Sequence, residues 1–249
     1  MKRCELSEAQ WVRIEPLLPG KLCDPGRSGS DNRLFVNGVL WVLRSGARWS
    51  DLPERYGKYK TVHKRFTRWA RTGVWERVFT LLARDRDNDY LMIDSLIVRA
   101  HAQAATGKGG CRDQALGRSR GGLTSKWHIA VDTFGRPVRF ILTGGNASDD
   151  KSAIPQLTGL IARHVLADKA YDSHAILDHV EASGARPIIP QRTCMPRNRD
   201  FDPAIYRLRN RVECTIGKLK QLRRVAIRYD RLAGNYLATL QLAALAFWC

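Results

Sequence analysis

Residues 90–98 read YLMIDSLIV, a stretch in which one carboxylate, Asp94, stands among apolar and β-branched side chains. A short apolar run of this composition predicts a buried β-strand. An isolated charge in a buried strand is costly unless it is paired or holds a cation. Asp94 therefore lies either at a solvated strand edge or in a functional site, and this stretch alone leaves both interpretations open.

The chain before this strand predicts a small helical domain, residues 1–88. Ser7 and Gln10 form a capping-box pattern at the start of the first helix, and Pro19-Gly20 ends it. Apolar residues recur at helical spacing in three further segments, which are 33–46, 60–71 and 74–84. A loop rich in Pro, Gly and Ser covers residues 19–32.

The chain after this boundary, residues 89–249, alternates strand and helix patterns. Further strands are predicted at 126–133, 137–144, 164–168 and 186–190, and helices at 150–163, 173–183, 204–224 and 234–248. The Gly-rich, basic residues 104–125 are expected to form a mobile loop. The pattern predicts an α/β domain with a small mixed sheet flanked by helices.

The charge balance points to a polyanionic partner. The 249 residues include 42 Lys and Arg against 24 Asp and Glu, a formal net charge of +18, which favours nucleic acid. A membrane partner is disfavoured because the longest apolar run, 236–249, is shorter than the roughly 20 residues of a span. Six cysteines without a C-x-x-C pair argue against a zinc ribbon and a disulfide scaffold, and predict reduced thiols in a cytoplasmic protein.

Two further carboxylates stand in informative positions. Asp168 ends a predicted strand, where ligand sites of α/β sheets gather, although it could simply cap a helix, a role for which Asp172 is better placed. Glu213 belongs to the basic helix, and at 100° per residue it shares an arc of about 60° with three other residues. These three are Tyr206, Arg209 and Lys220.

Three carboxylates on separate elements around one sheet match the needs of a two-metal phosphodiester site. Carboxylate oxygens suit Mg²⁺ or Mn²⁺, and two such ions stabilise the attacking and leaving oxygens of an in-line displacement. For Arg209 and Glu213 an ordinary i,i+4 surface ion pair is the competing explanation.

These residues closely resemble motifs of the bacterial insertion-sequence DDE transposases, in the group related to the insertion-sequence-five family. Tyr206, Arg209, Glu213 and Lys220 match the pattern Y-x₂-R-x₃-E-x₆-K, while 93–101 (IDSLIVRAH) and 167–173 (ADKAYDS) resemble the motifs of the first and second Asp. The resemblance implies a ribonuclease-H-like catalytic domain over 89–249. It also implies that Asp94, Asp168 and Glu213 hold the metal ions.

The resemblance further implies that Tyr206, Arg209 and Lys220 support this site or hold transposon-end DNA. In the helical domain, the segment 60–71 is basic on one side and apolar on the other, as in a helix-turn-helix-like DNA-binding domain, although a merely solvated face is the alternative. Its basic residues are Lys60, Lys64, Arg68 and Arg71. His128 and Asp172 are candidates for contacting the metal ligands, and a hydrogen-bonded structural role is the simpler explanation of His128.

The expected function is cleavage at the ends of an insertion sequence followed by transfer of the 3′-hydroxyl into target DNA. The expected partners are double-stranded DNA, both terminal inverted repeats and target, and at least one further copy of the chain. Such a protein would associate with the bacterial nucleoid. Two alternatives stay open, which are a nuclease without strand transfer and a transposase-derived DNA-binding protein without catalysis.

Overall fold

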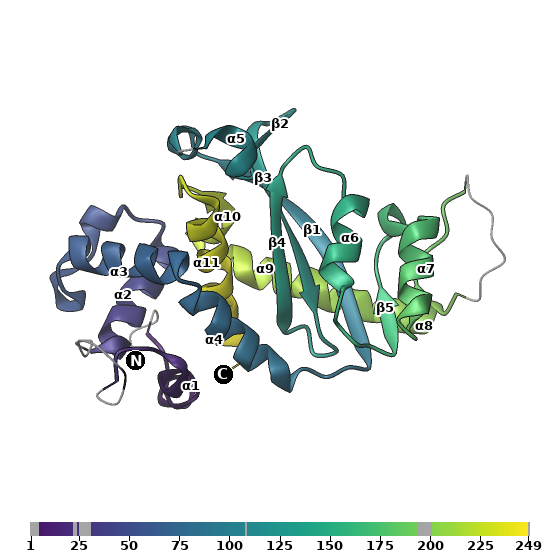
Figure 1. The fold of residues 1–249 in the computed structure, drawn as a ribbon, viewed down its shortest axis with the longest axis horizontal. Helices are drawn as coiled ribbons and strands as arrows, with labels where there is room; N and C mark the ends of the chain where they lie inside the picture. Colours follow the sequence, from purple (N-terminus) through teal and green to yellow (C-terminus); the bar gives the residue numbers. More distant parts are fainter. Residues whose placement is uncertain (1–4, 22–23, 25–30, 108, 194–200, 249) are drawn as a thin grey trace.

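The computed structural model describes residues 5–21, 24, 31–107, 109–193 and 201–248, and Figure 1 shows their arrangement. Four helices come first, which are α1 (Glu8–Ile14), α2 (Asn32–Ser45), α3 (Tyr59–Arg71) and α4 (Val74–Leu82). Both hydrogen bonds of the predicted capping box form between Ser7 and Gln10. The predicted helices of this region are therefore confirmed, with ends that differ by a few residues.

A seven-stranded mixed sheet follows. Its strands are β1 (Tyr90–Ala100), β2 (Gly117–Ser119), β3 (Gly122–Val131), β4 (Pro137–Gly144), β5 (His164–Leu166), β6 (Arg186–Ile188) and β7 (Ile227–Arg228). The strands β1, β3 and β4 pair antiparallel, while β5 and β7 both run parallel to β1, and β6 runs parallel to β5. The predicted mixed α/β sheet is confirmed.

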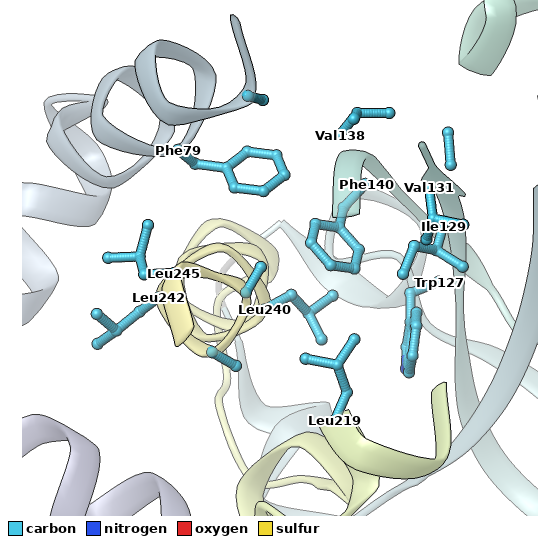
Figure 2. Packing of buried hydrophobic residues seen from close by; sticks show 14 of the residues in the cluster. Phe79, Trp127, Ile129, Val131, Val138, Phe140, Leu219, Leu240, Leu242 and Leu245 are labelled. Carbon is cyan, nitrogen blue, oxygen red and sulfur yellow. The ribbon is translucent and has the colours of Figure 1, made fainter. Parts of the chain in front are cut away.

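Helices cover both faces of this sheet. The helices α6 (Asp150–Leu157) and α7 (His174–Ala182) lie on one side, and α9 (Asn210–Lys220) and α11 (Ala233–Ala244) contact the other. Figure 2 shows α11 between Phe79 of α4 and the side chains of β3 and β4. Because α11 also packs on α2 and α3, the four N-terminal helices share a hydrophobic core with the sheet domain.

Three predicted elements differ most from the structure. The helix predicted at 150–163 ends at Leu157, and Gly159 takes a φ of +74°. The single helix predicted at 204–224 is divided into α8 (Pro203–Tyr206), a 3₁₀ turn (Arg207–Arg209), α9 and α10 (Arg223–Ala226). The loop predicted at 104–125 contains α5 (Gly110–Asp113) and the β2–β3 hairpin, whose turn is made possible by Gly122 at φ +97°.

The membrane and cysteine predictions can be compared with the structure only over the described residues. No helix in the described ranges is long and apolar enough to cross a membrane. Cys111 and Cys214 are exposed free thiols. The other four cysteines lie outside the described residues, so the predicted thiol state of Cys4, Cys23, Cys194 and Cys249 stays a prediction.

A buried hydrogen bond fixes α9 to the turn between β3 and β4, because the Thr215 hydroxyl donates to the Gly135 carbonyl at 2.6 Å. Thr215→Val keeps the shape of the side chain and removes the donor. We expect the free energy of unfolding in urea to fall by about 1 kcal/mol. Cys214→Ser changes an exposed neighbour on the same helix and should leave the free energy of unfolding unchanged. Equal stability of both variants and the parent protein would contradict this attachment.

Candidate active site

The register of two parallel strands brings the first two carboxylates together. Met92 of β1 is paired with Leu166, the last residue of β5. Asp94 and Asp168 each follow that pair by two residues, so they lie at the same level of adjacent chains, and paired strands are about 4.8 Å apart. The edge of β1 that pairs with β5 also pairs with β7, but β7 contacts β1 only at Arg99 and Ala100. The middle of β1 is thereby left for α9 to contact.

The Asp94 side chain is only 16% exposed and is held by two donors. Its Oδ1 accepts from the Ser95 amide at 2.7 Å, and its Oδ2 accepts from Arg209 at 3.0 Å. Burial raises the pKa of the Asp94 carboxyl, and the charges of Asp168 and Glu213 raise it further. These effects outweigh the opposing influence of Ser95 and Arg209 on that pKa. Asp94 is therefore not the solvated edge residue of the competing interpretation.

Asp168 stands where β5 turns into a short 3₁₀ helix, Lys169–Tyr171. Its Oδ1 accepts from the Ala170 amide at 2.8 Å, so one carboxylate oxygen caps this turn. Because the cap diverts the chain, the strand predicted to reach residue 168 ends at Leu166. Asp168 thus does cap a helical turn, as the alternative explanation from the sequence proposed, and it also lies close to Asp94.

Arg209 connects the third carboxylate to the first. Its guanidinium donates to Glu213 Oε1 at 2.5 Å and to Asp94 Oδ2 at 3.0 Å, and its side chain is 14% exposed. Burial lowers the pKa of Arg209, but the charges of Asp94 and Glu213 more than compensate and raise it overall. The pair of Arg209 and Glu213 is thus part of a three-residue bridge rather than an isolated surface ion pair.

Tyr206 faces the same three carboxylates. Burial raises the pKa of its hydroxyl, Arg209 opposes this, and the charges of Asp168, Glu213 and Asp94 raise it further. The structure therefore brings Tyr206, Arg209 and Glu213 of the predicted arc together. Lys220 is exposed at the end of α9, seven residues beyond Glu213, which is about 10 Å along a helix.

Tyr171 is a site residue that the sequence argument missed. It is almost fully buried, and burial together with the charges of Asp149, Asp94 and Asp168 raises the pKa of its hydroxyl. It lies inside the segment 167–173 that carried the second-Asp resemblance. The sequence signal was present, but an aromatic residue after a strand is usually a core residue.

His128 belongs to a buried polar group on the other face of the sheet. It is paired with Ser95 across the strands, so alternation places it on the face opposite Asp94. Its Nε2 is 3.0 Å from Thr143 Oγ1, and burial lowers the pKa of the imidazole to about 4. Asp149 lies 3.7 Å from its Nδ1 and forms an ion pair with Lys126. The predicted hydrogen-bonded histidine is confirmed.

Asp172 does not have the capping role suggested by the sequence. Ser173 is the N-cap of α7, because its hydroxyl accepts from the Ile176 amide. The buried Asp172 carboxylate instead accepts from the Arg192 amide at 2.7 Å. The capping prediction was wrong because Ser173, one residue closer to the helix, satisfies the free amide.

The donor set suits a hard divalent cation. Asp94, Asp168 and Glu213 offer only carboxylate oxygens, and the effects of Asp168 and Glu213 on the pKa of Asp94 show mutual repulsion that a cation would relieve. Within the described ranges, however, no three acidic, His or Cys side chains are gathered tightly enough to hold a metal. The chemistry of the three carboxylates fits such an ion, and Glu213, which is exposed, is held by Arg209 in this structure.

The basic face predicted on α3 is present. Val62, Phe66 and Trp69 are buried in the core. The four basic residues of the opposite face are exposed, and they are Lys60, Lys64, Arg68 and Arg71. The helix orientation deduced from the sequence is confirmed, and DNA binding by this face stays a prediction.

Two family models match the chain. Residues 6–79 match a family described as "putative transposase of IS4/5 family". Residues 86–248, well over half of the chain, match the family "transposase DDE domain". The first match ends within α4, and the second begins shortly before β1.

Relatives agree with these models. An uncharacterized protein of Sinorhizobium fredii, y4sN, is 47% identical over 100 residues, which are 40% of this chain and 80% of that protein. The "putative transposase for insertion sequence element IS6501" of Brucella ovis is 32% identical over 131 residues, which are 51% of this chain and 98% of that protein. Among solved structures, the Mos1 strand transfer complex aligns with 90% of this chain and 79% of that chain, at 12% identity and a TM-score of 0.32.

The structural similarity to Mos1 is distant, and the family assignment does not depend on it. The assignment depends on the domain model over residues 86–248, and the strand order of the sheet agrees with a ribonuclease-H-like fold. DNA is accordingly the partner of this protein. The chain belongs to the DDE transposase family, whose members cleave and transfer DNA in a reaction that depends on divalent metal ions.

Proposed function

We propose that Asp94, Asp168 and Glu213 are the metal ligands and catalytic residues with which this transposase cleaves insertion-sequence ends and joins the 3′-hydroxyl to target DNA. The observation that carries the proposal is the parallel β1–β5 register, which sets Asp94 beside Asp168, together with the Arg209 bridge from Asp94 to Glu213. Two Mg²⁺ or Mn²⁺ ions held by such carboxylates supply Lewis acidity to the attacking and leaving oxygens.

The residues around the carboxylates have positioning roles in this proposal. Arg209 and Tyr206 orient the carboxylates and contact the phosphates of the transposon end, since a guanidinium binds phosphate as well as carboxylate. Lys220 extends this contact along the strand. Tyr171, in the segment that carries Asp168, supports the carboxylates, whereas His128 has a structural role on the opposite face of the sheet. Asp172 holds the residue 192 backbone against the turn that carries Asp168.

The helical domain, residues 1–88, holds the DNA duplex in this proposal, and residues 89–249 perform the chemistry. The exposed cations of α3 contact phosphates of the terminal repeats. Joining two ends of one element requires two active sites, so a homodimer or larger assembly forms on DNA. Binding to chromosomal DNA places the protein at the bacterial nucleoid.

Removal of one carboxylate charge should separate binding from cleavage. Asp94→Asn keeps the side-chain shape but loses a charged ligand, so we expect metal-dependent cleavage of a duplex carrying the flanking ends of the element to fall at least about 100-fold. Binding of the same duplex should stay within about twofold. Asp178→Asn, on the exposed face of α7, is the matched control and should cleave normally. Normal cleavage by Asp94→Asn would remove this residue from the site.

Strand transfer distinguishes a transposase from a nuclease of the same fold. A labelled end that already carries a free 3′-hydroxyl should be joined to a target plasmid in the presence of Mg²⁺ or Mn²⁺, because the same carboxylates serve both steps. Gel analysis of the joined product measures this directly. Cleavage without joined product would favour the nuclease alternative, and binding without either product would favour the catalytically idle one.

The α3 surface should control the salt dependence of DNA binding. Replacement of Lys60, Lys64, Arg68 and Arg71 by Ala should make the slope of log K against log salt less negative by up to about 3.6, since each phosphate contact contributes about 0.9. The matched control changes the exposed cations Lys151 and Arg163 and should keep the parental slope. An unchanged slope in the fourfold variant would show that α3 does not contact phosphates.

A further inference from the structure

A second candidate site lies where α3 and the segment after α2 meet the sheet domain. A cleft of about 930 Å³ is formed there by residues 46–51, by α3, by the end of β1 and by the chain after β7. This volume is in the range of sites for nucleotide-sized ligands. His101 in its lining is seven residues beyond Asp94, which is about 23 Å along an extended chain, so the cleft is separate from the carboxylates.

A continuous row of planar groups crosses this cleft. His63 stacks on Trp49 at a centroid distance of 4.6 Å, and the Arg224 guanidinium lies 5.6 Å from Trp49 and 5.4 Å from Tyr229. Tyr229 is in turn 5.4 Å from His101. The row therefore joins the N-terminal helices to the sheet domain through rings and one guanidinium. His101, at its end, is exposed and leaves a ring available for stacking.

Charge alone does not explain the lining. Arg48 and Arg231 are exposed cations, but Asp51 and Asp230 also line the cleft. A surface built only to follow phosphates would not include two carboxylates. The Asp230 carboxyl is buried, its Oδ2 has no hydrogen-bond partner among the described residues, and burial raises its pKa.

The cleft is continuous with the proposed DNA-binding face of α3. His63 and Thr67 line the cleft, and at 100° per residue Thr67 lies within about 20° of Lys60, beside the basic face of α3. DNA held by that face therefore passes the opening. Bases inside a duplex are stacked on one another and cannot reach protein rings, whereas unpaired bases can. Rings and guanidinium groups together favour an unpaired strand over a duplex.

We propose that this cleft binds a short unpaired segment of a DNA strand, with its bases against the ring row and its phosphates at Arg48 and Arg231. The inference rests on the proposed function, because it assigns a second DNA contact to the same enzyme. It places that contact away from the carboxylates, since His101 is about 23 Å from Asp94 along an extended chain.

The test compares a labelled ten-nucleotide oligothymidine with a duplex of equal length by fluorescence anisotropy, without metal. Arg48→Ala with Arg231→Ala should weaken oligothymidine binding roughly tenfold or more, since phosphate contacts carry much of single-strand affinity. Duplex binding should stay within about twofold. Lys151→Ala with Arg163→Ala is the matched control, because it removes two exposed cations elsewhere, and it should bind both ligands as the parent does.

A second variant tests stacking apart from charge. His101→Ala removes the exposed ring at the end of the row, and it should weaken oligothymidine binding about fivefold or more, as expected for the loss of one stacked base. Parental affinity in both variants, or equal losses for oligothymidine and duplex, would overturn the inference. Asp94→Asn should bind oligothymidine normally. Failure of cleavage in the parent would thus count against the proposed function alone, and failure of oligothymidine binding against the cleft alone.

Discussion

Repulsion among three carboxylates is the interaction on which the site depends. Asp94 is held in a partly buried position by the sheet, and Asp168 and Glu213 add negative charge close to it. Neighbouring ionised carboxylates repel one another unless positive charge lies close to them. Arg209 supplies one positive charge by contacting Asp94 and Glu213 together. In the proposed function, this negative charge attracts divalent cations, and the cations in turn hold the anionic DNA backbone.

The sheet makes this unfavourable arrangement possible. β1 is bonded to β3 along most of its length, so the backbone at Asp94 cannot move to relieve the repulsion. β5 is only three residues long and ends two residues before Asp168, which leaves that side chain at the strand end rather than within the ladder. Glu213 comes from a helix instead, and its exposed side chain can change rotamer while α9 stays in place. The rigid pair and the adjustable third carboxylate follow from these differences.

The sequence predicted most of the elements because their signals are local. The β4 strand was predicted with its observed ends, since Pro137 and Gly144 mark them. Asp94 was ambiguous because its role depends on the register with β5, which no local pattern encodes. The break between α9 and α10 was missed because Arg224 is buried and donates to the Ala47 carbonyl, 177 residues away. Tyr171 and the ring row were missed for the same reason, since both arise only from tertiary contacts.

Arg224 also explains how the two parts of the chain keep a fixed separation. Its guanidinium lies between Trp49 and Tyr229, and with Arg228 it carries charge into the interior beside the buried Asp230. Separating buried opposite charges is costly, because each charge then lies in the interior without the opposite charge that offsets its burial. Contacts of this kind therefore allow little relative movement of the segments that they join. A transposase must deliver one chosen phosphate to its carboxylates while it holds the duplex elsewhere. A contact built from buried charge and stacked rings fixes the distance between the N-terminal helices and the sheet domain more firmly than a flexible linker would.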